Sequence, residues 1–434
     1  MTGRRLEEIL TSRPLTAVEW GLERTRELLR RLGDPQRGFR SIHVGGTNGK
    51  GSAAAMAAAV LTAQGRRVGL YTSPELRETP DRYRVDGRPL PRDLLTDCAE
   101  RIGPVAEELG ATFFEAATAL AFLAFREAEV EWAVAEVGLG GRLDATNVLE
   151  PAAVMITSVA RDHERFLGND LREIAREKAG ILKEGVPTAV GPMPSEAGAV
   201  VAERARRVGA PLRRLGEHGS VEDVAVTLEG TRFTYRSAGR PGGVELSVPL
   251  PGVHQAENAG VAILALDALE EPPSEEALRS GLSGLRWRGR YEVLRRDGLT
   301  WVLDAGHNPA SAAALADTLD RTAPPEPRVL LAAVLSDKDW RSMLAPLRER
   351  TRAGVLTVAP SAPSARRWDP AAAAAALGEG TEAMPDFDAA LARAAELAGQ
   401  GTVVVAGSCY TVGDVLRRLD PVPVGREAGG SAAG

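Results

Sequence analysis

Cysteine is scarce in this chain of 434 residues, with only Cys98 and Cys409 present. The two lie far apart in sequence and in no spacing that is typical of metal ligands. Neither a disulfide framework nor a zinc site is therefore indicated. This cysteine usage fits a protein of the cytoplasm, where thiols stay reduced.

Long apolar runs are missing as well. No run of about 18 apolar residues suggests a membrane span. The N-terminal segment carries Arg4, Arg5, Glu7 and Glu8 and contains no apolar core of signal-peptide length. We therefore expect no membrane partner and a cytoplasmic location.

The sequence also lacks an excess of positive charge. Its formal net charge is -6, with 44% hydrophobic and 26% charged residues, which is the composition of an ordinary soluble globular protein. This balance argues against nucleic acid as the main partner, so we expect small-molecule partners and no nucleic acid. The length exceeds the roughly 250–300 residues at which a single hydrophobic core stops growing, so two or more domains are expected.

The segment 40–52, RSIHVGGTNGKGS, predicts a phosphate-binding loop between a strand and a helix. Its glycines allow consecutive backbone N–H groups to point at phosphate oxygens beside a helix N-terminus. Lys50 would bring a mobile positive charge, and Ser52 a hydroxyl for phosphate or Mg²⁺. Common phosphate loops have glycine at the place of Val44 and Ser or Thr at the place of Gly51. The alternative is a plain glycine-rich turn with an exposed lysine.

Apolar runs alternate with helical periodicity over the first part of the chain, which predicts a parallel α/β sheet. Asp170 and Glu173 resemble a capping box for a helix that contains Lys178 and ends near Gly180. The charged, turn-rich residues 75–90 are expected to form a mobile surface loop. The expected helices are 5–32, 53–63, 91–109, 114–129 and 254–270, the expected strands are 68–72, 132–137 and 153–159, and a small β excursion is expected at 220–250.

The same alternation restarts at Thr300 and predicts a second, smaller α/β domain of the doubly wound, Rossmann-like type. The tail 421–434, rich in Pro, Gly and Ala, is predicted to be disordered. The predicted domains are 1–285, with the phosphate loop, and 299–420, joined by a linker at 286–298. The strands expected in the second domain are 300–304, 328–335, 354–358 and 402–406, and the helices are 310–319, 339–348, 370–377, 387–398 and 410–418.

Polar residues follow the predicted strands at the edge where ligands of open α/β sheets collect. Glu136 ends one strand and His163 follows another, so both are expected beside the phosphate loop, where Mg²⁺ needs ligands. Taken singly, a solvated strand end and a hydrogen-bonded loop histidine are the alternatives. Asp304 and His307 would face the same crevice if the second domain docks edge to edge against the first, and a plain turn is the alternative for them.

A series of short motifs occurs in the order that is found in one enzyme family. The most specific motif is EVGLGGRLDATN at 136–147. Over nearly its whole length the chain resembles bacterial folylpolyglutamate synthases and dihydrofolate synthases, which are Mur-type ATP-dependent ligases. The other motifs are HVGGTNGKGS at 43–52, TSP at 72–74, FFE at 113–115, DH at 162–163 with FLG at 166–168, EKAGI at 177–181, HQ at 254–255 with Asn258, GR at 289–290, DAGHNP at 304–309, and GS at 407–408 with Tyr410.

The resemblance implies an N-terminal phosphate-loop ATPase domain of the Mur-ligase type and a smaller C-terminal Rossmann-like domain. It implies that Lys50, His163 and Lys178 are catalytic, with His163 acting as a metal ligand and not as a general base. Lys178 matches a lysine that is carboxylated in the family, whereas the residue pattern alone suggests a surface lysine. The implied sites are ATP binding by Gly46, Thr47, Asn48, Gly49, Lys50, Gly51, Ser52, Asn258, Arg290, Asp304 and His307, metal binding by Ser52, Ser73, Glu136, His163 and Lys178, and folate or pterin binding by Phe113, Phe114, Glu115, Ala116, Leu143, Asp144 and Ala145.

The activity implied by the resemblance is ligation of L-glutamate to a folate or to dihydropteroate through an acyl phosphate. ATP would be a co-substrate and Mg²⁺, as two ions, the metal cofactor, and we expect a monomer. One alternative is a cell-wall amino-acid ligase of the same superfamily, which should carry an additional N-terminal domain that binds a uridine nucleotide. Another is a nucleotide-dependent switch, although the chain has no Asn-Lys-x-Asp motif for reading guanine.

The sequence departs from the family pattern at a few positions. Glu75 stands where the family usually has histidine, and PDRY at 80–83 replaces Asn-Glu-Arg-Ile. The usual Asp-Gly-Ala-His-Asn-Pro has its second and third residues exchanged here, as Ala305 and Gly306. The substrate contacts of the segment after Ser73, and the choice between the two acceptors, therefore stay open.

Overall fold

The computed structural model describes residues 6–11 and 21–420. The chain forms two compact units. The first unit runs to Arg288 and includes Ala313–Ala323, and the second comprises Gly289–Ala312 and the chain from Pro324 onward. The tail 421–434, predicted to be disordered, and residues 12–20 of the first predicted helix lie outside the described residues. Each unit is built around a mostly parallel sheet of its own.

The first unit contains an eight-stranded sheet with the strand order β4-β3-β2-β5-β1-β6-β7-β8. Its central strand β1 pairs in parallel with β5 and β6, so that Val44 lies opposite Glu136 and Met155. Because β5 and β6 flank β1, the segments that follow these three strands meet at one edge of the sheet. The strands are β1 (Arg40–Gly45), β2 (Val68–Tyr71), β3 (Tyr83–Val85), β4 (Arg88–Pro89), β5 (Trp132–Glu136), β6 (Ala153–Ile156), β7 (Thr188–Val190) and β8 (Leu212–Arg214).

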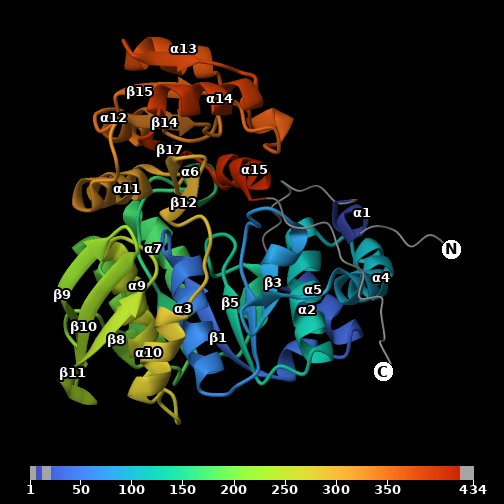
Figure 1. The fold of residues 1–434 in the computed structure, drawn as a ribbon. Coiled ribbons are helices and arrows are strands. Elements are labelled where there is room, and N and C mark those ends of the chain that lie inside the picture. The colour runs from blue at the N-terminus through green and yellow to red at the C-terminus, as the bar shows by residue number, and fades with distance from the viewer. Residues whose placement is uncertain (1–5, 12–20, 421–434) are drawn as a thin grey trace, which may run out of the picture. The chain divides into compact units, whose positions relative to one another are not determined.

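Helices cover both faces of this sheet (Figure 1). Successive side chains of a strand point to opposite faces, so each face carries apolar residues that pack against helices. In β5, Trp132 and Val134 face a core shared with α3, α9 and α10, whereas Ala133 and Ala135 face a core shared with α4 and α5. A third apolar cluster joins β6 to α7 and α8. The helices are α1 (Leu6–Thr11), α2 (Glu23–Arg31), η1 (Pro35–Arg37), α3 (Lys50–Ala63), α4 (Arg92–Glu108), α5 (Phe113–Glu127), η3 (Ala145–Val148), α6 (Glu164–Leu167), α7 (Leu171–Ala179), α8 (Ser195–Val208), α9 (Val253–Leu266) and α10 (Glu275–Ser283).

A separate antiparallel sheet confirms the β excursion predicted at 220–250. It consists of β9 (Gly219–Thr227), β10 (Gly230–Ser237) and β11 (Arg240–Val248), with β10 in the middle. Phe233 and Leu246 of this sheet pack in the same core as α9. Within residues 6–11 and 21–420, every helix is too short or too polar to traverse a lipid bilayer.

The prediction of a mobile loop over 75–90 was wrong, because part of this segment completes the first sheet. The turn η2 (Thr79–Arg82) is followed by β3, which pairs antiparallel with β2, and then by β4. Tyr83 is fully buried, and its ring stacks on that of Tyr71 with 5.7 Å between ring centroids. An aromatic residue within this charged segment was the available signal of a strand.

The second unit contains a six-stranded sheet with the order β12-β13-β17-β14-β15-β16. The last five of these strands pair in parallel, as expected for a doubly wound domain. β12 pairs antiparallel with β13 and lies within the predicted linker 286–298, so part of that segment belongs to the sheet. The elements from Glu292 onward are β12 (Glu292–Arg296), β13 (Leu299–Leu303), α11 (Pro309–Thr322), β14 (Arg328–Ala332), α12 (Trp340–Arg348), β15 (Ala353–Leu356), η4 (Ser364–Arg366), α13 (Pro370–Leu377), β16 (Thr381–Ala383), α14 (Phe387–Ala398), β17 (Thr402–Ala406) and α15 (Cys409–Leu419).

Gly281 of α10 packs so closely against α3 that a side chain has no room. A Cβ at this position would lie 2.7 Å from Val60 Cα and 2.8 Å from the Ala59 carbonyl oxygen. We expect Gly281→Ala to lower the free energy of unfolding by about 1–3 kcal/mol through overpacking, although alanine is the better helix former. The matched control is Gly198→Ala in α8, where the nearest atom to the Cβ position is Met193 Cγ at 3.8 Å. That variant should gain up to about 1 kcal/mol, and urea unfolding that shows equal stability for the two variants would contradict the prediction.

Candidate functional site

The predicted phosphate loop joins the end of β1 to the start of α3. Gly46 and Gly49 have φ angles of 139° and 82°, which residues with a Cβ rarely adopt. A Cβ on Gly46 would lie 2.0 Å from Thr157 Oγ1, and one on Gly49 would lie 2.2 Å from Asn258 Oδ1. Both positions therefore require glycine, and Asn258 of α9, a predicted ATP contact, lies against the loop.

The loop is anchored on the segment that follows β6. The Thr47 amide donates to the Ser158 carbonyl oxygen at 2.8 Å, and the Asn48 amide donates to Ser158 Oγ at 3.0 Å. Thr157 Oγ1 donates to the Asn48 carbonyl oxygen at 2.6 Å. The amides of Thr47 and Asn48 are thus already used, whereas the N-terminal turn of α3, residues 50–52, has backbone N–H groups that can donate to an anion.

Lys50, Ser73 and Glu136 come together at the edge of the sheet. Glu136 ends β5, and its side chain is 7% exposed. Its Oε1 lies 3.9 Å from Lys50 Nζ, and its Oε2 accepts a hydrogen bond from the Ser73 amide at 3.1 Å. Ser52 is buried in the first turn of α3. Two predicted metal ligands, Ser73 and Glu136, therefore lie beside the predicted catalytic lysine.

His163 follows β6 and lies next to a buried acid. Its backbone is left-handed, with a φ of 53°, and its amide donates to Asp162 Oδ1 at 2.8 Å. Its Nε2 lies 4.0 Å from Asp162 Oδ2, and the Asp162 side chain is 7% exposed. Asp162 is a further candidate functional residue, which the sequence analysis placed in the motif DH but to which it assigned no role. Its position directly before His163, in the segment that follows a strand, was the signal that could have found it.

Lys178 is buried next to the phosphate loop, which the residue pattern alone did not suggest. It is 5% exposed, and its Nζ donates to the Gly46 carbonyl oxygen at 2.8 Å. Burial, followed by the positive charge of Lys50, lowers the pKa of Lys178 to about 7. A large share of this amine is therefore uncharged at neutral pH. Lys178 lies four residues after buried Ile174 on the apolar face of α7, a spacing that could have indicated its burial.

The segments predicted to bind pterin meet at residues 138–139. A Cβ on Gly138 would lie 2.2 Å from the ring of Phe114 in α5, and the Leu139 amide donates to Asp144 Oδ2 at 2.9 Å. Burial raises the pKa of Asp144, which caps η3. The structure thus brings the two segments together, and the neighbouring predicted residues are Phe113, Ala116, Leu143 and Ala145.

Glu115, another predicted pterin contact, is held by the fold itself. Its Oε2 accepts from the Thr112 amide at 2.8 Å, while Thr112 Oγ1 accepts from the Glu115 amide at 3.3 Å, which is a capping box. Arg24 of α2 forms an ion pair with the same carboxylate at 2.8 Å. These contacts account for a buried carboxylate at this position without a ligand.

Glu75, which replaces the usual histidine, forms an ion pair with Arg82. Arg82 belongs to the altered segment 80–83, and its guanidinium lies 5.3 Å from the centroid of the Phe113 ring. Arg82 is buried, so a carboxylate at position 75 offsets part of the free-energy cost of burying its charge. The departure at position 75 therefore contacts the one residue of segment 80–83 that agrees with the family pattern.

The predicted ATP contacts of the second unit lie in the turn after β13. Asp304 accepts hydrogen bonds from the Tyr291 amide at 2.9 Å and from the Gly306 amide at 2.8 Å. His307 Nδ1 lies 3.1 Å from the Ala305 carbonyl oxygen. A Cβ on Gly306 would lie 2.8 Å from Asp304 Oδ1, so this turn needs glycine at 306, in agreement with the exchanged order of the pair.

His43 is connected to Asp144 through Thr146. Its Nε2 lies 2.8 Å from Thr146 Oγ1, which in turn donates to Asp144 Oδ1 at 2.5 Å. Because the hydroxyl donates to the carboxylate, it accepts from His43, and Nε2 therefore carries the proton. Within the described residues His43 Nδ1 has no hydrogen-bond partner. Burial, followed by the charge of Lys183, lowers the pKa of His43 to about 3.

Models of two protein families match the chain. The Mur ligase middle domain matches residues 44–266, and the glutamate ligase domain of Mur ligases matches residues 289–409. The two matches follow one another along the chain and fall largely in the first and the second unit, respectively.

Individual relatives are similar over most of the chain. The folylpolyglutamate synthase of Lacticaseibacillus casei is 36% identical over 404 residues, which are 90% of this chain and 92% of that protein. The dihydrofolate synthase/folylpolyglutamate synthase of Bacillus subtilis (strain 168) is 36% identical over 338 residues, with shares of 75% and 78%. The solved structure of Mycobacterium tuberculosis folylpolyglutamate synthase with ADP has a TM-score of 0.88 at 32% identity and covers 96% of this chain and 98% of that one.

The buried His43 should make stability depend on pH. The pKa of this histidine falls from 6.5 in the unfolded chain to about 3 in the fold, so the unfolded state binds the extra proton between these values. The contribution of the neutral His43 side chain to the free energy of unfolding is therefore complete above pH 6.5 and is lost as the pH falls below that value. Between pH 7 and pH 5 the wild type should lose about 2 kcal/mol more than His43→Gln in urea unfolding. The control is the exposed His218→Gln, and equal pH dependence in wild type and His43→Gln would refute the prediction.

Proposed function

Because the chain belongs to the folylpolyglutamate synthase and dihydrofolate synthase family of Mur-type ligases, we propose that it uses ATP to join L-glutamate to the carboxylate of a folate or of dihydropteroate. The family determines the reaction class, which is ATP-dependent ligation. The observation that carries the proposal is the position of Lys50, which lies 3.9 Å from Glu136 at the carboxyl edge of the sheet and perturbs the buried amine of Lys178. This combination of charges suits phosphoryl transfer.

A free carboxylate is a poor electrophile, so the acceptor is first activated as an acyl phosphate. One acceptor carboxylate oxygen attacks the γ-phosphorus of ATP, the bond to the bridging oxygen breaks, and ADP leaves. The amine of glutamate then attacks the acyl carbon, inorganic phosphate leaves, and one proton is released as the amide forms. Lys50 and the N–H groups of the first turn of α3 stabilise the charge on the transferring phosphoryl group.

The predicted set of metal-binding residues fits Mg²⁺. Glu136 offers a buried carboxylate, Ser52 and Ser73 offer hydroxyls, and His163 offers an imidazole, so most donors are the oxygen ligands that this cation prefers. These residues would hold the metal as its protein ligands. Bound Mg²⁺ would supply positive charge that neutralises the phosphates of ATP.

Lys178 would contribute to a second Mg²⁺ site as a carbamate. As an ammonium group it would repel a metal ion, and it already lies in the electric field of Lys50. Addition of the uncharged amine to CO₂ forms a nitrogen–carbon bond and releases one proton, so that an anionic carbamate replaces a cation. The burial of Lys178 supports this modification, because the carbamate would be shielded from water.

Further contacts complete the proposal. Asn258 and the loop residues Gly46, Thr47, Asn48, Gly49 and Gly51 would contact ATP, as would Asp304, His307 and Arg290 of the second unit. The guanidinium of Arg290, which donates to the Gly289 carbonyl oxygen at 3.0 Å, can pair with phosphate oxygens. Phe114 offers a ring and Asp144 a hydrogen-bonding carboxyl to the pterin. The enzyme would act as a monomer in the cytoplasm.

The proposal predicts acceptor-dependent phosphate release. The protein, incubated with ATP, Mg²⁺, L-glutamate and either dihydropteroate or tetrahydrofolate, should release phosphate and form the amide product, followed by mass spectrometry. Lys50→Ala should lower kcat by about 10²–10³, since it removes a charge that stabilises the transition state. Lys338→Ala, which removes a lysine outside the loop, is the control. Absence of amide product with both acceptors would overturn the proposal, and near wild-type turnover of Lys50→Ala would remove the loop from the mechanism.

Carboxylation of Lys178 predicts one carbamate signal in ¹³C NMR. After incubation with ¹³C-bicarbonate, the wild type should show this signal and Lys178→Ala should not. Lys338→Ala should retain it, which excludes a contribution from an ordinary surface lysine. Lys178→Ala should lose activity by at least about 10² and recover part of it with short carboxylic acids, which replace the missing carboxylate. A fully active wild type without the signal would show that Lys178 acts unmodified.

A further inference from the structure

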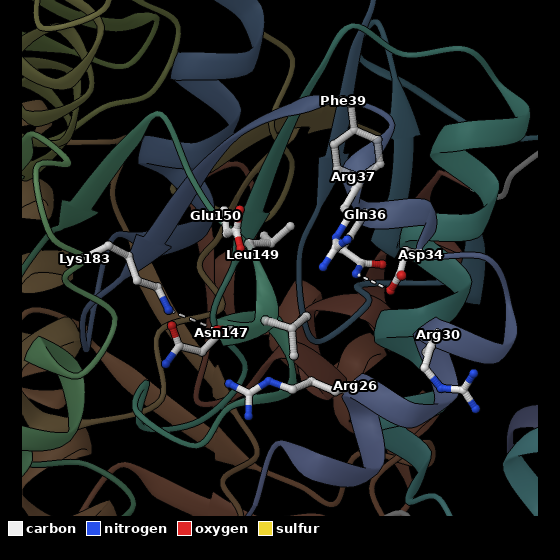
Figure 2. A pocket seen from close by; sticks show the side chains of 11 residues that line it. Arg26, Arg30, Asp34, Gln36, Arg37, Phe39, Asn147, Leu149, Glu150 and Lys183 are labelled. Carbon is white, nitrogen blue, oxygen red and sulfur yellow. Dashed lines mark hydrogen bonds between the residues drawn. The ribbon is translucent and has the colours of Figure 1, made fainter.

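A cavity of about 920 Å³ lies in the first unit, beside the residues that precede β1 and β6 (Figure 2). Its walls are formed by α2, by η1, by the segment from η3 to Glu150, and by Lys183 after α7. The phosphate loop follows the other end of β1. The cavity is therefore separate from the site described above.

Basic side chains dominate the polar lining of this cavity. Arg26 comes from α2, Arg37 from η1 and Lys183 from the segment after α7 (Figure 2). In the part of the chain that the structure describes, neither Arg26 nor Arg37 has an ion-pair partner. The acids of the lining, Asp34 and Glu150, leave an excess of positive charge. Such an excess in a concave site attracts anions.

Lys183 shows that these charges act on one another. Its Nζ donates to the Asn147 carbonyl oxygen at 3.1 Å (Figure 2). Burial, followed by the positive charge of Arg26, lowers the pKa of Lys183. The two cations therefore repel each other, and an anionic group between them would remove this repulsion.

We propose that this cavity binds a γ-glutamyl chain, either free or as the tail of a polyglutamylated folate. Such a chain carries several carboxylates along an extended backbone, which suit Arg26, Arg37 and Lys183 on three separate segments. Phosphate and a simple tricarboxylate also carry negative charge, but they are compact and fill less of a cavity of about 920 Å³. The choice of ligand rests on the proposed function, because polyglutamylation makes chains of this kind.

The test is the binding of tri-γ-L-glutamate to the full chain without ATP, measured by isothermal titration calorimetry at low ionic strength. We expect the double variant Arg26→Gln/Arg37→Gln to bind at least about tenfold more weakly, since it loses two charge-assisted contacts. Arg207→Gln, which removes an exposed arginine of α8 outside the cavity, should bind within about twofold of wild type. Inorganic phosphate and tricarballylate should each bind at least about tenfold more weakly than the tripeptide.

The possible outcomes separate this proposal from the ligase function. No binding of the tripeptide to wild type, or equal binding by the double variant, would overturn the site. Equal binding of phosphate or tricarballylate would overturn the ligand class. Ligation of glutamate to a monoglutamyl acceptor, measured separately, should be unchanged in the double variant, and its loss there would contradict a site separate from catalysis. A wild type that binds the tripeptide but does not ligate would refute the proposed function and leave the binding site in place.

Discussion

The close packing of the phosphate loop on the segment after β6 is the constraint on which the first unit depends. Gly46 has no room for a Cβ against Thr157. The carbonyl oxygen and the hydroxyl of Ser158 accept hydrogen bonds from the amides of Thr47 and Asn48, respectively. The carbonyl oxygen of Gly46 is in turn the acceptor for Lys178. A side chain at 46 would therefore move the loop, its anchor and the buried lysine together. The register of β1 between β5 and β6 sets this arrangement, since it brings Glu136 to the same edge.

Much of this could be predicted from the sequence, because the decisive signals are local. Strand, glycine-rich loop and alanine-rich helix follow one another in 40–63, and the acid of Glu136 directly ends an apolar run. The position of Lys178 could not be predicted in the same way. Its burial arises from a long-range contact with Gly46, 132 residues away in the chain, and only a resemblance to a family pointed to it.

The predictions that differed from the structure, for segment 75–90 and for the linker, differed for a physical reason as well. The segment 75–90 is charged, yet η2, β3 and β4 fold within it because Tyr83 finds a partner in Tyr71, on a different strand. β12 lies in the segment predicted as a linker, and its sequence, EVLRR, has few apolar residues, because an edge strand paired on one side only does not need more. Glu115 shows the converse case, since its capping box and its ion pair with Arg24 account for the burial of a motif residue by contacts within the fold. Composition cannot distinguish these cases, because each depends on the partner that tertiary packing supplies.

The ion pair between Glu75 and Arg82 has a consequence for how this chain can change over evolutionary time. Replacing Glu75 by the usual histidine removes the carboxylate that pairs with a buried guanidinium, and this carries a free-energy cost unless the surroundings of the arginine change as well. The family pattern nevertheless combines this histidine with the same arginine at position 82. Position 75 is therefore epistatic with the residues around Arg82 and not with Arg82 itself, so the difference at position 75 can persist without any benefit to substrate binding.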